Sequence, residues 1–148
     1  MLIINIDGAS RGNPGLSGIG IVITKDNFSV AEYKEFLGKR TNNQAEYAAL
    51  KRALQMAYPI DNEITILSDS ELVVNQRRNK YKVRNKQLKI LSREISNLER
   101  RFDTIIYEHI PREKNRTADL LANHAIDEHV KYQKLLQLNY MAAVRTQS

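Results

Sequence analysis

The stretch Leu2-Ile3-Ile4-Asn5-Ile6-Asp7 decides the fold, because it is an apolar run that ends on a carboxylate. Short apolar runs of this kind are typical of strands that are buried on both faces, in the centre of a parallel sheet. A second run, Ile64-Thr65-Ile66-Leu67-Ser68, lies in an expected strand over residues 63–68 and is followed by Asp69. We expect the two runs to be neighbouring central strands whose acids lie at the edge where open α/β sheets bind ligands.

The rest of the chain is typical of a strand meander followed by alternating helices and strands. After a turn over residues 7–15, rich in Gly, Ser, Asn and Pro, we expect strands over residues 18–24 and 30–37. We expect helices over residues 41–58, 70–77, 85–101 and 115–130, and a fifth strand over residues 104–109. This order predicts an α/β fold with a five-stranded mixed sheet, in the order 3-2-1-4-5, flanked by helices.

Composition limits the possible functions. The 148 residues are enough for one domain with a core, and the net charge of +6 favours a polyanionic partner. Because the chain has no cysteine, it has no disulfide partner, no thiol nucleophile and no Cys-bound zinc, which fits a cytoplasmic location. No apolar stretch reaches the roughly 18 residues of a membrane span, and we expect no cleaved signal peptide.

Four carboxylates occupy positions that are hard to explain as solvated surface groups: Asp7, Glu46, Asp69 and Asp119. Two carboxylates about 4 Å apart repel by roughly 4 kcal/mol at an effective dielectric of about 20, enough to raise one pKa by about 3 units. A cluster must therefore take up protons or hold a cation, and oxygen ligands favour Mg²⁺ or Mn²⁺ over zinc. The alternative is four independent acids that cap helices or end strands.

The acids lie within four short motifs. These are Asp7-Gly8-Ala9-Ser10-Arg11-Gly12-Asn13-Pro14-Gly15, Thr41-Asn42-Asn43-Gln44-Ala45-Glu46, Ser68-Asp69-Ser70 and Asn115-Arg116-Thr117-Ala118-Asp119. In this order and spacing they resemble the motifs of type 1 ribonuclease H. The resemblance implies a ribonuclease H-like fold and one domain over residues 1–130. Residues 131–148 would form a C-terminal tail, which is compatible with a further helix.

The resemblance also implies a mechanism, in which an endonuclease cuts the RNA strand of RNA/DNA hybrids with two divalent ions, Mg²⁺ or Mn²⁺. By position, Asp7 would bridge both ions, Glu46 and Asp69 would share one, and Asp119 would hold the other. Two such ions can stabilise the attacking and the leaving oxygen of an in-line displacement. The products would carry 5′-phosphate and 3′-hydroxyl ends. We expect the protein to act on hybrid as a monomer.

The same resemblance indicates residues that contact the hybrid. They are Asn13, Lys39, Arg40, Thr41, Asn42 and Asn43. Thr41 and Asn42 would lie near a DNA-strand phosphate at a helix N-terminus. Asn13 and Asn43 could reach the minor groove or the 2′-hydroxyls that distinguish RNA from DNA. Local capping and turn roles are the alternative explanation of Thr41, Asn42 and Asn13, and we favour the contact with the hybrid.

A run of cations is a further candidate for substrate binding. Seven of the thirteen residues from Arg77 to Lys89 are Lys or Arg, and none is an acid. We expect this run to open a helix, where positive charge opposes the macrodipole, so a phosphate-binding role explains it better than a solvated face does. The residues that we select for this role are Lys80, Lys82 and Arg84.

The chain departs from the family pattern in two places. Many members carry a histidine in a glycine-containing loop before the last acid, and some carry an inserted basic helix. Here the loop reads Ile110-Pro111-Arg112-Glu113-Lys114, and too few residues are present for the inserted helix. We expect a structural role for His109, at the end of the fifth strand, and consider Arg112 or Glu113 as replacements for the loop histidine.

Two other functions stay open on the sequence alone. The first is a module that binds hybrids without cutting them, although a decayed copy would tend to lose one of the four acids. The second is a nuclease domain derived from a reverse transcriptase or a transposase. The start at Met1 and the absence of linker sequence favour a stand-alone protein.

Overall fold

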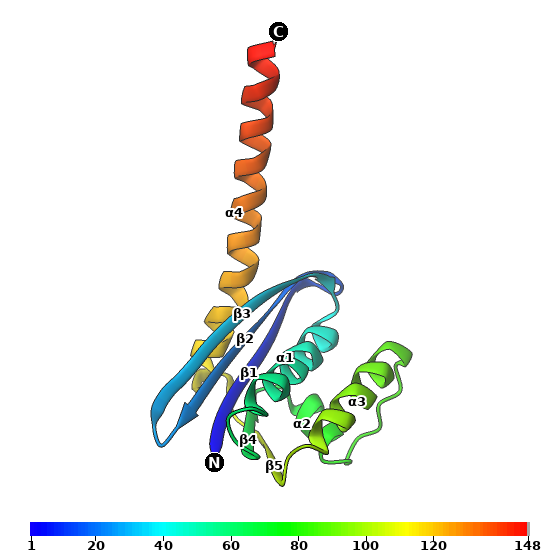
Figure 1. Ribbon diagram of the computed structural model, residues 1–148. Coiled ribbons are helices and arrows are strands. Elements are labelled where there is room, and N and C mark those ends of the chain that lie inside the picture. The colour runs from blue at the N-terminus through cyan, green and yellow to red at the C-terminus, as the bar shows by residue number, and fades with distance from the viewer. Residues whose placement is uncertain (148) are drawn as a thin grey trace.

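Five strands form one mixed sheet in the computed structural model, which describes residues 1–147 (Figure 1). They are β1 (Leu2–Gly12), β2 (Gly15–Lys25), β3 (Phe28–Arg40), β4 (Glu63–Ser68) and β5 (Thr104–His109). The order across the sheet is β3-β2-β1-β4-β5. β1, β2 and β3 pair antiparallel, whereas β4 pairs parallel with both β1 and β5. The predicted sheet and its strand order are confirmed.

Helices cover both faces of this sheet. They are α1 (Asn42–Ala57), α2 (Glu71–Arg77), α3 (Lys86–Glu99) and α4 (Arg116–Gln147), with a 3-10 turn at Arg112–Lys114. α1 packs on β1 and against α3, whereas α4 packs on β2 from the other face. α1 begins as expected, because the Thr41 hydroxyl accepts from the Gln44 amide and the Gln44 side chain accepts from the Thr41 amide.

The core lies between the sheet and α1. In β2 the alternation of side chains directs Ile19, Ile21 and Ile23 to this face, and all three are buried. On the helix side, the small residues Ala45, Ala49 and Ala53 are fully buried, which allows α1 to lie close to the strands. Gly18 and Gly20 of β2 alternate with these isoleucines and face α4 instead.

Our prediction of a turn over residues 7–15 is wrong. β1 continues to Gly12 and pairs with β2 as far as Gly15, so only Asn13 and Pro14, joined by a cis peptide bond, turn the chain. Residues with high turn propensity adopt strand geometry here because β2 supplies partners for their backbone groups. Asp7 therefore lies in the middle of a long strand rather than at its end.

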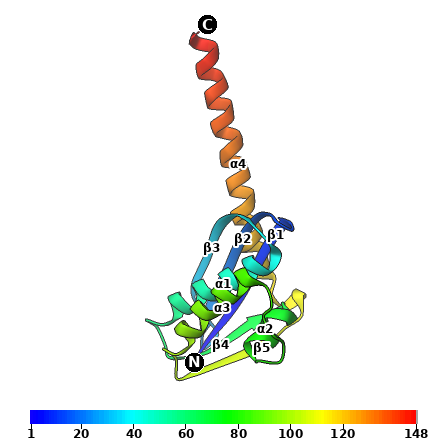
Figure 2. The same cartoon turned by 90° about the vertical axis from the view of Figure 1, so that its right-hand side faces the viewer.

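The last helix does not end near Val130, as we expected, but runs to Gln147. Every residue from Lys131 to Gln147 is exposed, and this part of α4 extends away from the sheet in two perpendicular views (Figures 1 and 2). Its sequence is rich in Leu, Ala and Gln and has no Gly or Pro, which favours helix. The tail predicted over residues 131–148 ends on Ser148, which lies outside the described residues, and the domain boundary at residue 130 stays a prediction.

Candidate active site

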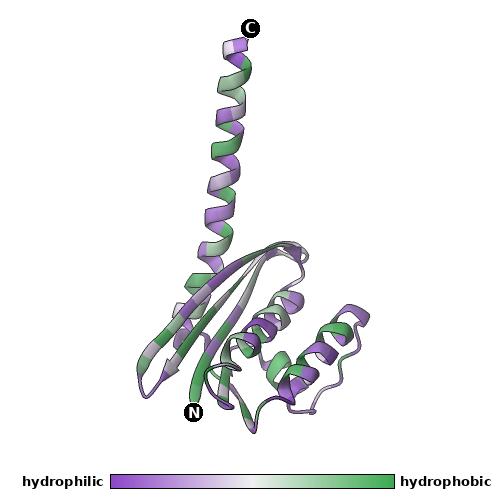
Figure 3. Cartoon of the chain, viewed as in Figure 1, coloured by the Kyte–Doolittle hydropathy of each residue, from purple (hydrophilic) through white to green (hydrophobic). Residues whose placement is uncertain are grey.

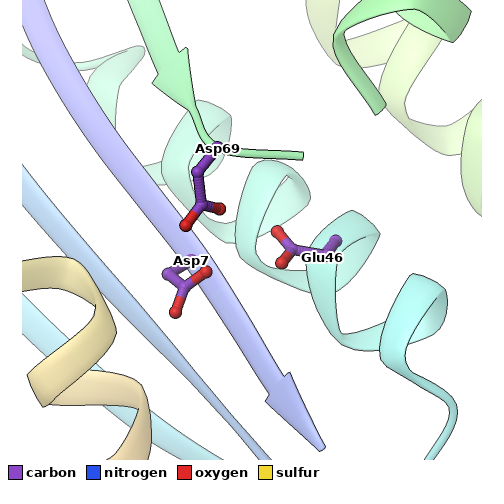
Figure 4. Close-up of side chains that lie close together, drawn as sticks. All are labelled: Asp7, Glu46 and Asp69. Carbon is purple, nitrogen blue, oxygen red and sulfur yellow. The ribbon is translucent and has the colours of Figure 1, made fainter. Parts of the chain in front are cut away.

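Three of the four acids meet above the centre of the sheet, each from a different element. Asp7 lies on β1, Glu46 in the second turn of α1 and Asp69 directly after β4. One carboxylate oxygen from each lies within 4.8 Å of the others. In Figure 4 the carboxylates of Glu46 and Asp69 face Asp7 from two sides. Because β1 and β4 are parallel and Ile6 pairs with Ser68, the residues that follow these two are neighbours.

Gly8 allows α1 to approach β1 at this point. A Cβ atom on Gly8 would lie 2.3 Å from the backbone carbon of Ala45 and 2.4 Å from the Glu46 nitrogen. A larger residue would therefore push the first turns of α1 away from the sheet. The absence of a side chain next to Asp7 is what places Glu46 against it.

Asp119 reaches the same cavity from the opposite face of the sheet. Gly20 is the residue paired with Asp7 across β1 and β2, and a Cβ on Gly20 would lie 2.0 Å from the Ala118 carbonyl oxygen. α4 therefore rests directly on the backbone of β2. As a result, Asp119 lines one open cavity together with the other three acids.

Two asparagines, the buried Asn115 and the half-buried Asn5, connect α4 to β1, and sequence reasoning missed their role. The Asn115 side chain donates to the Ile6 carbonyl at 2.8 Å and accepts from the Asn5 side chain at 3.1 Å. The Asn115 carbonyl accepts from the Asp119 amide at 3.1 Å, which joins the first turn of the helix to this network. The available signal was Asn5, the polar residue inside an otherwise apolar run.

Burial and the mutual repulsion of the acids raise the pKa values of the three clustered carboxyl groups. Burial, followed by the negative charges of Asp69 and Asp119, raises the pKa of Asp7 from 3.8 to about 8. Burial, followed by the charges of Asp7 and Asp69, raises the pKa of Glu46 well above its ordinary value. Burial also raises the pKa of Asp69, as does the charge of Asp119, while Arg112 opposes the rise.

The donor set fits a hard divalent cation. All the ligand atoms on offer are carboxylate oxygens, which Mg²⁺ and Mn²⁺ prefer. Glu46 Oε2 is buried and has no hydrogen-bond partner among the described residues. A buried, unpaired carboxylate oxygen costs free energy, and a bound cation would remove this cost together with the mutual repulsion of the acids.

Two basic side chains lie at the rim of the acid cavity. The Arg112 guanidinium lies 3.9 Å from Asp119 Oδ1, and its side chain is 77% exposed. His109 Nε2 lies 3.2 Å from the backbone carbonyl oxygen of Asp69, and His109 also lines the acid cavity. The structural role that we expected for His109 stays a prediction. Arg112 lines the acid cavity, whereas Glu113, the other candidate for the loop role, lies outside it.

The predicted hybrid contacts gather around the N-terminus of α1. Asn13 accepts from the Asn42 amide at 3.1 Å through its side-chain oxygen, and Asn42 also lines the acid cavity. A second groove runs between α1 and α3. Its lining includes Lys39, Arg40, Thr41, Gln87 and Ile90. Asn43, in the first turn of α1, is half-buried.

The structure divides the run of cations into two groups. Arg77 is largely buried in an ion pair with Glu99, and Arg78 donates to the Tyr107 carbonyl, so these two hold the fold together. The remaining cations before α3 are exposed in an irregular segment, residues 79–85, which we call the cation segment. Lys80, Lys82 and Arg84 belong to it. Our expectation that they oppose a helix macrodipole is wrong, because α3 begins only at Lys86.

Comparisons with known proteins agree with this site. The family model described as reverse transcriptase-like matches residues 5–125. The chain is 43% identical over 129 residues to the bifunctional protein Rv2228c of Mycobacterium tuberculosis, covering 85% of this chain and 35% of that protein. It is 39% identical over 124 residues to ribonuclease HI of Halobacterium salinarum, covering 82% of this chain and 62% of that protein. The chain thus spans between about a third and two thirds of the length of these curated relatives.

Among solved structures, LC11-RNase H1 in complex with an RNA/DNA hybrid superposes with a TM-score of 0.84 at 41% identity. The match covers 88% of this chain and 99% of that one. No helix within residues 1–147 is both long enough and apolar enough to span a bilayer. Motifs, strand order and relatives agree, and the chain therefore belongs to the type 1 ribonuclease H family.

Proposed function

We propose that this chain is an endonuclease that hydrolyses the RNA strand of RNA/DNA hybrids, leaving 5′-phosphate and 3′-hydroxyl ends. The observation that carries this proposal is the convergence of four acids, from β1, α1, α4 and the end of β4, on one open cavity. Membership of the ribonuclease H family supports the activity. The hybrid bound to LC11-RNase H1 supports the substrate.

The family implies dependence on a divalent metal, and we propose two ions per site, Mg²⁺ or Mn²⁺. Glu46 and Asp69 would hold one, Asp119 the other, and Asp7 would contribute to both. Asp7, Glu46 and Asp69 are the three acids whose oxygens lie within 4.8 Å of one another. When bound, such ions supply Lewis acidity that activates a water and stabilises charge on the departing 3′ oxygen.

The residues around the acids position them. Asn115 and Gly20 hold the start of α4 against the sheet, and Gly8 allows Glu46 to reach Asp7. Preorganisation of this kind is effective because a displacement of about 1 Å can reduce a rate by about 100-fold. We therefore assign Asn115 as a positioning residue.

Arg112 is the residue that we propose in place of the family's loop histidine. It lines the acid cavity next to Asp119, whereas Glu113 does not. An arginine stays protonated in proteins, so Arg112 would hold a phosphate oxygen rather than transfer a proton. If so, Arg112→Lys should keep more activity than Arg112→Ala, and neither should shift the pH profile. A shifted profile would indicate proton transfer instead.

The hybrid would bind along the groove at the start of α1. Thr41 uses its hydroxyl oxygen as a cap acceptor, so the hydroxyl hydrogen stays available for a phosphate of the DNA strand. Asn13 uses its side-chain oxygen, so its amide hydrogens stay available as donors. We propose that Asn42 and Asn43 read the minor groove or the ribose, with Lys39, Arg40 and the cation segment contacting phosphates.

A single chain supplies all four acids, so we propose that catalysis needs only one copy. We also propose that the enzyme acts in the cytoplasm, where primers and transcription-derived hybrids form.

The test is cleavage mapping on matched substrates: an end-labelled hybrid, an RNA duplex and a DNA duplex, each with Mg²⁺, Mn²⁺ or a chelator. We expect metal-dependent cleavage within the RNA strand of the hybrid, with products that carry a 5′-phosphate. Tight binding of the hybrid without cutting, in either metal, would favour a binding module instead.

A further inference from the structure

Asp119 differs from the other three acids in how it is held. It is not one of the three whose oxygens lie within 4.8 Å of one another, and its side chain is 29% exposed. It also comes from α4, on the face of the sheet opposite α1. A carboxylate that serves as a metal ligand must keep one orientation, and hydrogen bonds from neighbouring groups usually provide it. Groups outside the cluster must therefore orient Asp119.

Asn123, one turn further along α4, is hydrogen-bonded to Asp119. Its side-chain nitrogen, Nδ2, donates to Asp119 Oδ1 at 3.3 Å and to the Asp119 carbonyl oxygen at 3.0 Å. Asn123 is half-buried and lines the acid cavity with the four acids. A donor on one oxygen of a carboxylate fixes its orientation and leaves the other oxygen for a cation.

Arg11 holds the other side of the Asn123 amide. Arg11 follows Asp7 by four residues on β1, and because side chains alternate along a strand, both leave the same face. Arg11 Nη2 donates to Asn123 Oδ1 and to the Asn123 carbonyl oxygen, at 3.4 Å each. Since Oδ1 accepts from Arg11, the amide presents its nitrogen, and not an oxygen, to Asp119.

The guanidinium of Arg11 is itself anchored one helical turn further on. Arg11 Nη1 lies 2.7 Å from Asp127 Oδ1, and this bond lowers the pKa of Asp127. β1 begins with apolar residues and becomes hydrophilic towards its turn, where Arg11 lies (Figure 3). An exposed ion pair contributes little to stability. The planar fork of an arginine, however, can bond two groups at once, so the pair with Asp127 sets where Nη2 lies against Asn123.

A purely local explanation covers only part of these contacts. An asparagine side chain in a helix often bonds to the carbonyl one turn back, and this accounts for the bond to the Asp119 carbonyl. It does not account for the bond to Asp119 Oδ1, nor for the donor that comes from a distant strand. Together the bonds join β1, which carries Asp7, to the carboxylate of Asp119. They therefore fix the relation between the two acids that we propose to share an ion.

We propose that Asn123 is a positioning residue that orients the Asp119 carboxylate for a divalent ion, and that Arg11 acts through Asn123. The assignment rests on the proposed function, in which Asp119 is a metal ligand. Asn115 fastens the start of α4 to β1, whereas Asn123 acts on the carboxylate itself. Loss of a hydrogen bond to a metal ligand typically lowers metal affinity or activity by about 10- to 100-fold.

The test is Asn123→Leu, which has nearly the shape of asparagine but no amide. Calorimetry measures Mn²⁺ binding to the protein without hybrid, and cleavage assays measure the Mn²⁺ concentration that gives half-maximal rate. We expect weaker Mn²⁺ binding and a half-maximal concentration that is higher by about 10-fold or more, with an unchanged KM for the hybrid. Lys34→Met is the matched control, because it removes the ion pair between Lys34 and Glu128, which also joins the sheet to α4 but lies outside the acid cavity. It should behave like the wild type.

A second variant, Arg11→Met, tests the outer part of the network. Its side chain is exposed, so the variant should fold like the wild type. We expect a rise in the metal requirement that is smaller than that of Asn123→Leu. The double variant Arg11→Met/Asn123→Leu should need no more metal than Asn123→Leu alone, because Arg11 acts through Asn123. Additive effects of the two substitutions would overturn the role of Arg11.

Equal Mn²⁺ binding by Asn123→Leu and the wild type would overturn the proposal even if the Tm falls, because the bond would then be purely structural. If Asn123→Leu does not fold, Arg11→Met decides: a metal requirement equal to that of the wild type would overturn the proposal. A wild type that binds Mn²⁺ without cutting hybrid would contradict the proposed function, and calorimetry would then judge the role of Asn123 alone. A wild type that neither binds Mn²⁺ nor cuts would overturn both.

Discussion

The acid cavity and the cation segment differ in how firmly the fold holds them. The acids are placed by the packing of the fold. Strand pairing places Asp7 beside Asp69, Gly8 allows Glu46 to approach β1, and Gly20 and Asn115 hold the start of α4 against the sheet. Lys80, Lys82 and Arg84 are exposed and lie outside helices and strands. Like charges brought together need a rigid frame, whereas cations that contact a phosphate backbone work as well from a solvated segment. We therefore expect substitutions in the cavity to change the rate, and those in the segment to change affinity.

The largest expected effect is that of Asp7→Asn, which replaces the central carboxylate with an uncharged amide of nearly the same shape. We expect cleavage to fall by at least about 1,000-fold, since several kcal/mol of charge stabilisation depend on bound metal. Hybrid binding should persist. In chelator at neutral pH, the variant should be more stable than the wild type, because folding of the wild type must place a proton on Asp7 that the unfolded chain lacks, and the variant avoids this cost. Gel assays, filter binding and thermal melts measure these three quantities, and substantial residual cleavage in either metal would contradict the assigned role.

The second effect is that of Asn115→Ala, which changes no ligand atom. It leaves the Ile6 carbonyl and the Asn5 side chain without their partner, so we expect a loss of about 1–3 kcal/mol in stability. Because the start of α4 is released, we expect kcat to fall by about 100-fold with a higher metal requirement. Asn5→Ala is the matched control, since it removes one bond of the network and spares the bond to Ile6. Equal rates for both variants and the wild type would show that the network does not position the site.

The third effect concerns the cation segment, through the triple variant Lys80→Gln/Lys82→Gln/Arg84→Gln. We expect hybrid affinity to fall, and the slope of log affinity against log salt to flatten by up to about 2–3. The rate at saturating hybrid should be unchanged. Lys131→Gln/Lys134→Gln, which neutralises two exposed cations of α4 beyond Val130, is the control and should leave the slope as it is. An unchanged slope in the triple variant would show that the cation segment does not contact the phosphates of the hybrid.

The smallest effect is a pH dependence of stability in the absence of metal. The pKa of Asp7 is raised from 3.8 to about 8, so the folded state keeps a proton that the unfolded chain loses. The free energy of unfolding therefore falls as the pH rises. The stabilisation is complete below pH 3.8 and is lost as the pH approaches 8.

Thermal melts in chelator measure this dependence, with Asp7→Asn as the reference that lacks the group. The difference between the two proteins should widen with pH. Added Mg²⁺ should raise the wild-type Tm most at high pH, since the ion needs ionised ligands. A difference that does not vary with pH would show that Asp7 titrates near its ordinary value.

The sequence by itself determined those features that arise from neighbours along the chain. The residues Glu63–Ser68 and Thr104–His109 form strands with the expected bounds, because a short apolar run between turn signals is too short for a helix and favours a buried strand. The capping box at Thr41 similarly placed the start of α1. The four motifs identified the acids and their order, and the strand order placed Asp7 and Asp69 side by side.

Only the tertiary structure decided what depends on groups far apart in the chain. The backbone pairing of β1 with β2 makes residues 8–12 a strand instead of the expected turn. The ion pair with Glu99 buries the Arg77 side chain, so Arg77 is not available to bind phosphate with the other cations. The high pKa of Asp7 and the unpaired oxygen of Glu46 arise from burial beside other acids, which no local pattern encodes. Local propensity acts over a few residues, whereas burial, charge and strand pairing depend on which distant segments the fold brings together.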